Sequence, residues 1–308
     1  NVAKPGAGVV LAGSAEAGQQ FASTPTTLSG VLEHTVPTSF FDAAAKNEVL
    51  QVVFFTVLFA IALARVPAAK REPLLKFFES LNDVMFKFTD IVMRFAPIGI
   101  FAAMAATIGA SGIELLLNLG KLVLTLYVAL IVFVLLALVP VALLFRIPLR
   151  AFWKRAREPW LIAFTTASSE AALPLAMENM EKFGVPRRIV AFVLPTGYSF
   201  NLDGSTLYLS VAALFVAQAA GADLTISQQL VIMLTLMLTS KGVAAVPRAS
   251  LVILSGALAT FGLPLEGVAV ILGVDAFMDM ARTSVNLLGN CLASAAMARW
   301  EGEEEFET

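Results

Sequence analysis

Six polar side chains follow one another at helical spacing in the run 275–290, which reads DAFMDMARTSVNLLGN. They are Asp275, Asp279, Arg282, Thr283, Asn286 and Asn290. An α-helix advances about 100° per residue, so this spacing places all six within an arc of about 100°. The run lies inside a longer apolar segment, 268–297. Charges at membrane depth cost at least about 2.5 to 3.5 kcal/mol each, so acids, a base and amides on one face predict a functional site.

A structural ion pair is the alternative interpretation of the same run. Asp275 and Arg282 could pair only to lock one helix against its neighbours. That interpretation leaves a second acid, Asp279, and two amides without a role.

Composition places these residues in an integral membrane protein. Of the 308 residues, 58% are hydrophobic and 14% are charged, whereas a soluble domain has about 25% charged residues. The net charge of −2 argues against a nucleic-acid partner, and the single histidine excludes a site with several histidines. The chain begins NVAKPGAG without an initiator methionine, so we expect upstream sequence to be missing.

Membrane spans are expected in the first half of the chain. Residues 32–45 and 49–64 could form one broken span, 74–108 an amphipathic helix, and the uncharged run 122–145 a transmembrane helix. Basic clusters at 65–76 and 146–157 flank two of these elements and can both be cytoplasmic. The stretch 110–121 would then lie outside, and the acidic tail 301–308 inside.

The second half contains interrupted apolar segments. Residues 160–177 and 230–263 each have a break of small residues, and we expect both to form re-entrant helical hairpins, since irregular backbone at membrane depth must line a cavity or lie buried. A spanning helix at 189–219 is interrupted by TGYSFNLDG, where Gly197 and Gly204 would let the backbone unwind. Unwound carbonyls beside Asn201 and Asp203 suit a small cation. A plain turn is the alternative for NLDG alone.

Four motifs in order resemble one family. TTASSEAALP (165–174), NLDGSTLY (201–208), TSKGVAAVP (239–247) and DMARTSVNLLGN (279–290) are similar to the glutamate/aspartate and dicarboxylate:cation symporters. The resemblance implies an all-α, multi-span, inverted-repeat elevator transporter, a homotrimer in the bacterial inner membrane, without its first three spans. Residues 1–146 would be the remaining scaffold and trimerisation region, with some contribution to the transport domain, 147–300 the transport core, and 301–308 a cytoplasmic tail.

The resemblance also implies a substrate site. Arg282 matches the arginine that binds the substrate side-chain carboxylate through a bidentate fork, and Asp279 matches the acid that accepts the substrate ammonium. Asp275 would orient Arg282. Other substrate contacts implied by the match are Ser168 and Ser169 at the tip of hairpin one, Ser205, Val246 and Ser250 on hairpin two, Thr283 and Asn286.

Coupling ions, Na⁺, H⁺ or both, are implied in the same way, with no organic cofactor. The matching cation ligands are Gly197, Ser199, Asn201, Asp203, Ser240, Asn286 and Asn290. Three positions depart from sodium-coupled or vertebrate members: Asn290 replaces an aspartate, Val243 a threonine and Leu209 an acid. Glu170 and Lys241 resemble the bacterial proton-coupled branches. A buried Glu170 would have a raised pKa and could bind a proton, so we expect proton coupling to contribute and sodium dependence to be weaker.

These expectations favour uptake of glutamate and aspartate, because Asp279 would attract an ammonium and repel a plain dicarboxylate. A C4-dicarboxylate symporter is the nearest alternative. An ion channel could use the same polar path, although Arg282 beside Asp279 suits a zwitterionic acid better. An intramembrane hydrolase could use Ser168 or Ser169 as nucleophile, but no base is evident.

Overall fold

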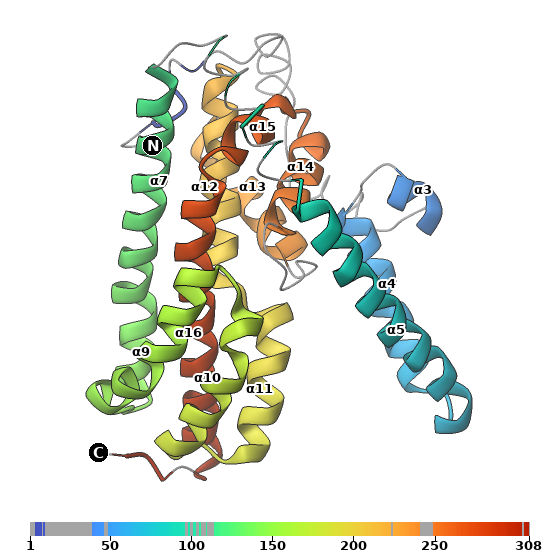
Figure 1. Cartoon of the computed structure of the whole chain (residues 1–308), viewed down its shortest axis with the longest axis vertical. Coiled ribbons are helices and arrows are strands. Elements are labelled where there is room, and N and C mark those ends of the chain that lie inside the picture. Colours follow the sequence, from blue (N-terminus) through green and yellow to red (C-terminus); the bar gives the residue numbers. More distant parts are fainter. Residues whose placement is uncertain are drawn as a thin grey trace.

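The computed structural model is built from helices (Figure 1). It describes residues 4–7, 9, 39–45, 49–95, 98, 101–102, 105, 109, 114–222, 224–240, 249–303 and 305–307, and contains no strand within these ranges. The helices of the first half are α3 (Phe40–Ala45), α4 (Val49–Ala64), α5 (Ala68–Met93), α7 (Glu114–Phe133), the π-helical segment η1 (Val134–Leu138) and α8 (Val139–Leu144). Those of the second half are α9 (Leu149–Thr166), α10 (Ser169–Phe183), α11 (Arg187–Phe200), α12 (Asp203–Ala219), α13 (Ile226–Thr239), α14 (Ala249–Thr260), α15 (Glu266–Leu272) and α16 (Asp275–Glu301).

Helix α16 is the centre of the assembly, and α7, α9, α10, α11 and α12 pack around it. Two pairs of helices approach it from opposite ends (Figure 1). In that view α9 and α10 occupy the lower half of the molecule, and α13 and α14 the upper half. Helices α4 and α5 project away from this core.

The first helix pair extends further than the sequence pattern indicated. We expected a hairpin at 160–177, preceded by a basic cluster, but α9 already begins at Leu149 and includes most of that cluster. Its buried residues, among them Ala151, Ala156 and Ala163, recur on one face, so the helix continues through the charged part. At the turn, Ser168 caps α10 by accepting a 3.2 Å hydrogen bond at Oγ from the backbone of Ala171.

The interruption between α11 and α12 is narrower than expected. Only Asn201 and Leu202 leave the helical conformation, so Gly197 and Gly204 do not unwind the chain. Instead they permit close packing. A Cβ at Gly197 would overlap Oδ1 of Asn290, and one at Gly204 would overlap the backbone of Arg282.

We expected the polar run 275–290 to lie inside one continuous apolar segment, but a break between two helices precedes it. Helix α15 ends at Leu272, and Asp275 is the first residue of α16. A carboxylate there is stabilised by the positive end of the helix dipole.

Helix α7 begins at Glu114, so the stretch 110–121, which we expected outside the membrane, is helical from that residue on. Leu115, Leu119, Leu122 and Leu126 form its buried stripe and extend the helix beyond the uncharged run. The apolar helical run Leu115–Leu144 and the broken run Arg187–Ala219 are long and apolar enough to cross a membrane. Likewise, α5 begins at Ala68, before the expected Leu74. It ends at Met93, where Arg94 and Phe95 form a turn, so the helix expected over 74–108 is interrupted there.

The acidic tail, which we expected only to be cytoplasmic, is docked on the base of the first helix pair. The backbone amides of Glu305 and Glu307 donate to the carbonyls of Gly184 and Phe183 at 3.0 and 2.9 Å. Phe306 stacks on Phe183 with ring centroids 4.7 Å apart. The carboxylate of Glu307 accepts from Lys154 at 2.9 Å and Arg155 at 2.7 Å, so the tail joins both helices of the pair.

Candidate functional site

The polar face of α16 is buried. All six side chains expected from the spacing are at most 8% exposed. Burial of two acids and a guanidinium is tolerated only where charges are paired and hydrogen-bonded, so their partners determine what the face can do.

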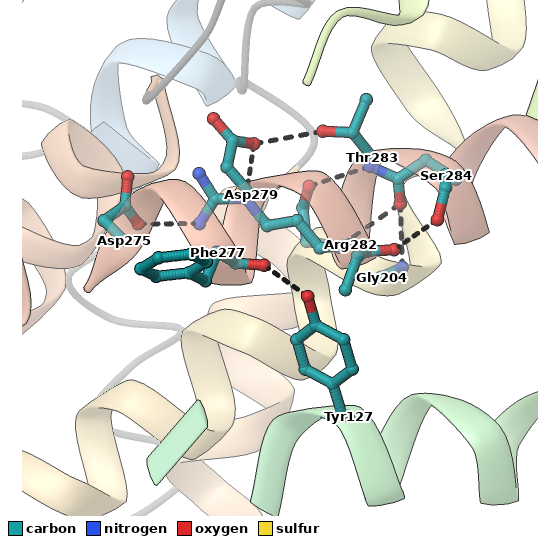
Figure 2. A network of polar contacts seen from close by, with 11 residues as sticks. Tyr127, Gly204, Asp275, Phe277, Asp279, Arg282, Thr283 and Ser284 are labelled. Carbon is teal, nitrogen blue, oxygen red and sulfur yellow. Dashed lines mark hydrogen bonds and ion pairs between the residues drawn. The ribbon is translucent and has the colours of Figure 1, made fainter. Parts of the chain in front are cut away.

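Arg282 is held between the two acids of its own helix (Figure 2). Its Nε donates to Oδ1 of Asp279 at 3.0 Å, and its Nη1 donates to Oδ1 of Asp275 at 3.3 Å. The same Asp279 oxygen accepts from Thr283 Oγ1 at 3.0 Å. Asp275 therefore contacts Arg282 directly, as expected of a residue that orients it.

Tyr208 on α12 packs its ring against the guanidinium. The Arg282 Cζ lies 3.9 Å from the centre of its ring, a cation–π contact that favours the charged guanidinium in a desolvated setting. Tyr208 was not among the residues that we expected in the site. Its spacing of four residues from Gly204 and three from Ser205 indicates one helical face, and that signal could have found it.

Asn286 joins α16 to the first turn of α12. Its Oδ1 accepts from the backbone amides of Gly204 at 2.7 Å and Ser205 at 3.2 Å, and its Nδ2 donates to Ser205 Oγ at 2.9 Å. The N-cap residue of α12, Leu202, makes no side-chain cap. Asn286 thus supplies the cap from a distant helix, a structural role that the sequence did not indicate.

Four of the expected cation ligands meet near the interruption of α11 and α12. Asn201 Nδ2 donates to Asn290 Oδ1 at 3.0 Å, and Gly197 packs against that same oxygen. Asp203 lies close by, because a Cβ added at Gly289 would be 2.8 Å from its Oδ2. The group combines one carboxylate with two side-chain amides, and their oxygens are donor types that hard cations prefer.

Ser240, a further expected ligand, is buried at the end of α13. Its Oγ accepts from Thr206 Oγ1 at 3.1 Å and donates to the Met237 carbonyl at 2.8 Å. The first of these hydrogen bonds joins the end of α13 to α12 at Thr206, the residue that follows Ser205. Ser250, in the first turn of α14, is 3% exposed.

Several expected residues fall outside the described part of the chain. These are Lys241, Val243 and Val246 in the segment 241–248, and the side chain of Ser199. Their expected roles stay predictions.

At the turn between α9 and α10, the burial of one residue differs from what we expected. Ser169 is buried, whereas Ser168 makes its described hydrogen bonds within the pair. We expected Glu170 to be buried, but it is exposed in the single chain. It lies in the first turn of α10, where a carboxylate complements the helix dipole and faces outward.

The chain also matches a known protein family. The model of the sodium:dicarboxylate symporter family matches residues 1–300. A proton/glutamate-aspartate symporter of Escherichia coli K12 is 45% identical over 309 residues, which cover 98% of this chain and 71% of the relative.

Two further relatives are named for other coupling ions or substrates. A proton/sodium-glutamate symport protein of Geobacillus stearothermophilus is 46% identical over 272 residues, covering 88% of this chain and 64% of the relative. A C4-dicarboxylate transport protein of Bacillus subtilis 168 is 41% identical over 309 residues, covering 98% and 73%. The chain thus spans between about two thirds and three quarters of these relatives.

Proposed function

The chain belongs to the sodium:dicarboxylate symporter family, and on that premise we propose that it takes up glutamate and aspartate together with protons, sodium ions or both. This family consists of transporters and not of enzymes. The relatives named above as glutamate-aspartate and glutamate symporters support the choice of acidic amino acids.

The observation behind the proposed substrate is the pairing of Asp279 with Arg282 on a buried face. The guanidinium can form a fork with a carboxylate, and the neighbouring acid can accept an ammonium group. A zwitterionic acid with a second carboxylate supplies both partners. A plain C4-dicarboxylate lacks the ammonium and would meet an acid without compensation.

In the free site these groups bond to one another, so substrate binding must exchange partners. Asp279 Oδ1 now accepts from Arg282 and Thr283. We propose that the incoming carboxylate takes over Arg282 and that the ammonium takes over Asp279, while Asp275 and Tyr208 keep the guanidinium in place. Exchange of charged partners, rather than creation of an unpaired charge, keeps the cost of binding in a buried site low.

Other roles remain part of the proposal. Hairpin one (α9 and α10) and hairpin two (α13 and α14) would be re-entrant, with Ser168, Ser169, Val246 and Ser250 near the substrate. The cation would be bound near Gly197, Asn201, Asp203 and Asn290, with Ser199, Ser240 and Asn286 as further ligands. Ser205 and Thr283 would bind the substrate.

The proposed transport cycle is an elevator motion within a homotrimer in the bacterial inner membrane. We assign the core 147–300 to the moving part. Helix α7 packs against α12 and α16, and its Tyr127 donates to the Phe277 carbonyl at 2.9 Å (Figure 2), so we place α7 with the moving part. The projecting helices α4 and α5 would belong to the scaffold.

The test is uptake of labelled aspartate, glutamate and succinate by the full-length protein in vesicles, with proton and sodium gradients imposed separately. We expect accumulation of the amino acids, and accumulation under a proton gradient without sodium. Succinate as the preferred substrate would instead establish the C4-dicarboxylate alternative. Background uptake without sodium at every pH would exclude the proton coupling.

A further inference from the structure

A groove of about 330 Å³ opens where α8 and α16 end side by side. Its walls are Leu144, Phe145, Arg146, Arg299 and Trp300. Two of these residues are large and apolar but highly exposed, Leu144 at 77% and Trp300 at 78%. The groove therefore combines apolar surface with two guanidinium groups and lies apart from the polar face of α16, which is buried in the core.

The backbone at Arg146 has a conformation that residues other than glycine rarely adopt. Its φ is +50°, in the left-handed region where helix ends usually have glycine. The amides of Arg146 and Ile147 close the helix end by donating to the carbonyls of Leu143 at 3.0 Å and Ala142 at 2.8 Å. For the stability of the fold alone, glycine would suit this turn better than arginine. Backbone outliers of this kind cluster at functional positions.

Arg299 of α16 supports this turn. Its Nε donates to the Phe145 carbonyl at 3.0 Å and its Nη2 to the Arg146 carbonyl at 3.1 Å. It also lies over the ring of Phe306, 4.9 Å from the centroid. The neighbouring helix thus satisfies the two carbonyls that directly follow α8 and fixes the turn that places the exposed Arg146 beside the groove.

The surroundings indicate which ligand fits. The apolar run Leu115–Leu144 leads into the groove, and its outer side chains are open, with Leu136 74% and Leu143 60% exposed. Arginine and tryptophan at the end of such a run mark the boundary between hydrocarbon and lipid headgroups. Basic pockets between spanning helices on the cytoplasmic side bind anionic headgroups.

We propose that this groove binds one anionic phospholipid. The headgroup phosphate accepts hydrogen bonds from Arg146, with Arg299 adding positive charge, and Trp300 and Leu144 contact the glycerol and the upper acyl chain. The chains continue along the open apolar side of η1 and α8. The proposal rests on the proposed membrane location, but not on which acid is transported.

The test uses the full-length protein purified in a neutral detergent. Phosphatidylglycerol and phosphatidylcholine with identical chains are titrated, and bound lipid is measured by native mass spectrometry and by the shift in thermal unfolding. We expect the anionic lipid to bind more tightly and to raise the unfolding temperature. Inorganic phosphate is a separate titration, and an equal stabilisation by phosphate alone would overturn the assignment to a lipid.

Arg146→Gly is the decisive variant, because it relieves the left-handed backbone while it removes the charge. Without lipid it should unfold at or above the temperature of the parent protein. Its affinity for phosphatidylglycerol should fall about fivefold or more, since one basic group near a membrane contributes about that factor. Arg146→Gln should lose affinity to a similar extent.

Arg187→Gln is the matched control, because the Arg187 side chain is 88% exposed and lies at the start of α11. It should leave phosphatidylglycerol binding unchanged. Equal binding by Arg146→Gly and the parent, or an equal loss in Arg187→Gln, would refute the site. Because the readout is lipid binding and not uptake, an error in the proposed substrate would leave this result unaffected.

Discussion

Asn201 and Asn290 are joined by a 3.0 Å hydrogen bond between amides, across the interruption of α11 and α12. The two residues are 89 positions apart in the chain, and both lie in the proposed cation site. An amide pair needs no cation for charge balance, whereas a carboxylate at either position would need one. The pair thus gives a physical basis for the weaker sodium dependence that we propose for this protein.

Replacing Asn290 with aspartate should increase sodium dependence. The new carboxylate would be buried in a nearly isosteric position and would be stabilised by a bound cation. We expect sodium to raise the unfolding temperature of Asn290→Asp more than that of the parent protein, and to stimulate aspartate uptake more. Potassium chloride at equal ionic strength is the control. An identical sodium response in both proteins would remove Asn290 from the cation site.

Replacing Arg282 with alanine should abolish uptake and weaken the fold. Two buried carboxylates lose their shared partner, which costs about 3 to 5 kcal/mol, and uptake should fall about 100-fold or more. Arg282→Lys separates the two effects, because an ammonium keeps the charge but not the fork. We expect it to recover much of the unfolding temperature but little aspartate uptake. Near-normal uptake by Arg282→Lys would argue that the arginine is only structural.

Adding a methyl group at Gly204 should disrupt the contact between α12 and α16. The Cβ of Gly204→Ala would overlap the backbone of Arg282, which cannot move as a side-chain end could. We expect a loss of about 1 to 3 kcal/mol in unfolding free energy. Gly120→Ala on α7 is the control, since its Cβ would meet nothing within 4 Å. It should be neutral or stabilising by up to about 1 kcal/mol. Equal effects of the two changes would contradict the packing argument.

A disulfide between Thr206→Cys and Ser240→Cys should stop transport reversibly. The two hydroxyl oxygens are 3.1 Å apart, so cysteines at these positions are close enough to bridge with small adjustments. We propose that, within the moving core, hairpin two opens as a lid over the substrate site. The bond would hold this lid against α12, so we expect oxidation to block aspartate uptake and a reductant to restore it. Each single cysteine variant should be insensitive to the oxidant. Full uptake by the bridged protein would mean that α13 does not move relative to α12 during transport.

Docking of the tail should weaken in acid. Hydrogen bonds from Lys154 and Arg155 lower the pKa of Glu307 below its ordinary value. A carboxyl whose pKa is lowered in the folded state stabilises that state above its unfolded pKa, and this contribution is lost as the pH falls through the folded pKa. Hydrogen exchange of the Glu305 and Glu307 amides, corrected for the intrinsic rate, should therefore speed up at acid pH. Glu307→Gln should remove most of this pH dependence; an unchanged profile would exclude Glu307 as the titrating group.

The sequence alone predicted the polar face of α16 because helical periodicity is a local property. Arg282, Asp279 and Asp275 are neighbours on one helix, three and seven residues apart, so their pairing follows from spacing. The motifs likewise indicated the family, which the family model confirms. The interruption near Asn201 was predicted from its polar and glycine residues, but its width was not.

Only the tertiary structure decided which distant groups complete the site. Three contacts show this: Tyr208 lies over Arg282, Asn286 caps α12, and Asn290 accepts from Asn201. In each contact the two residues are 74 to 89 positions apart in the chain. No periodicity within one helix encodes such contacts, because they depend on how the helices pack. The same holds for the acidic tail, whose composition indicated only a charged end. Its docking requires the backbone of Gly184, the ring of Phe183 and the base of α9 to meet in space.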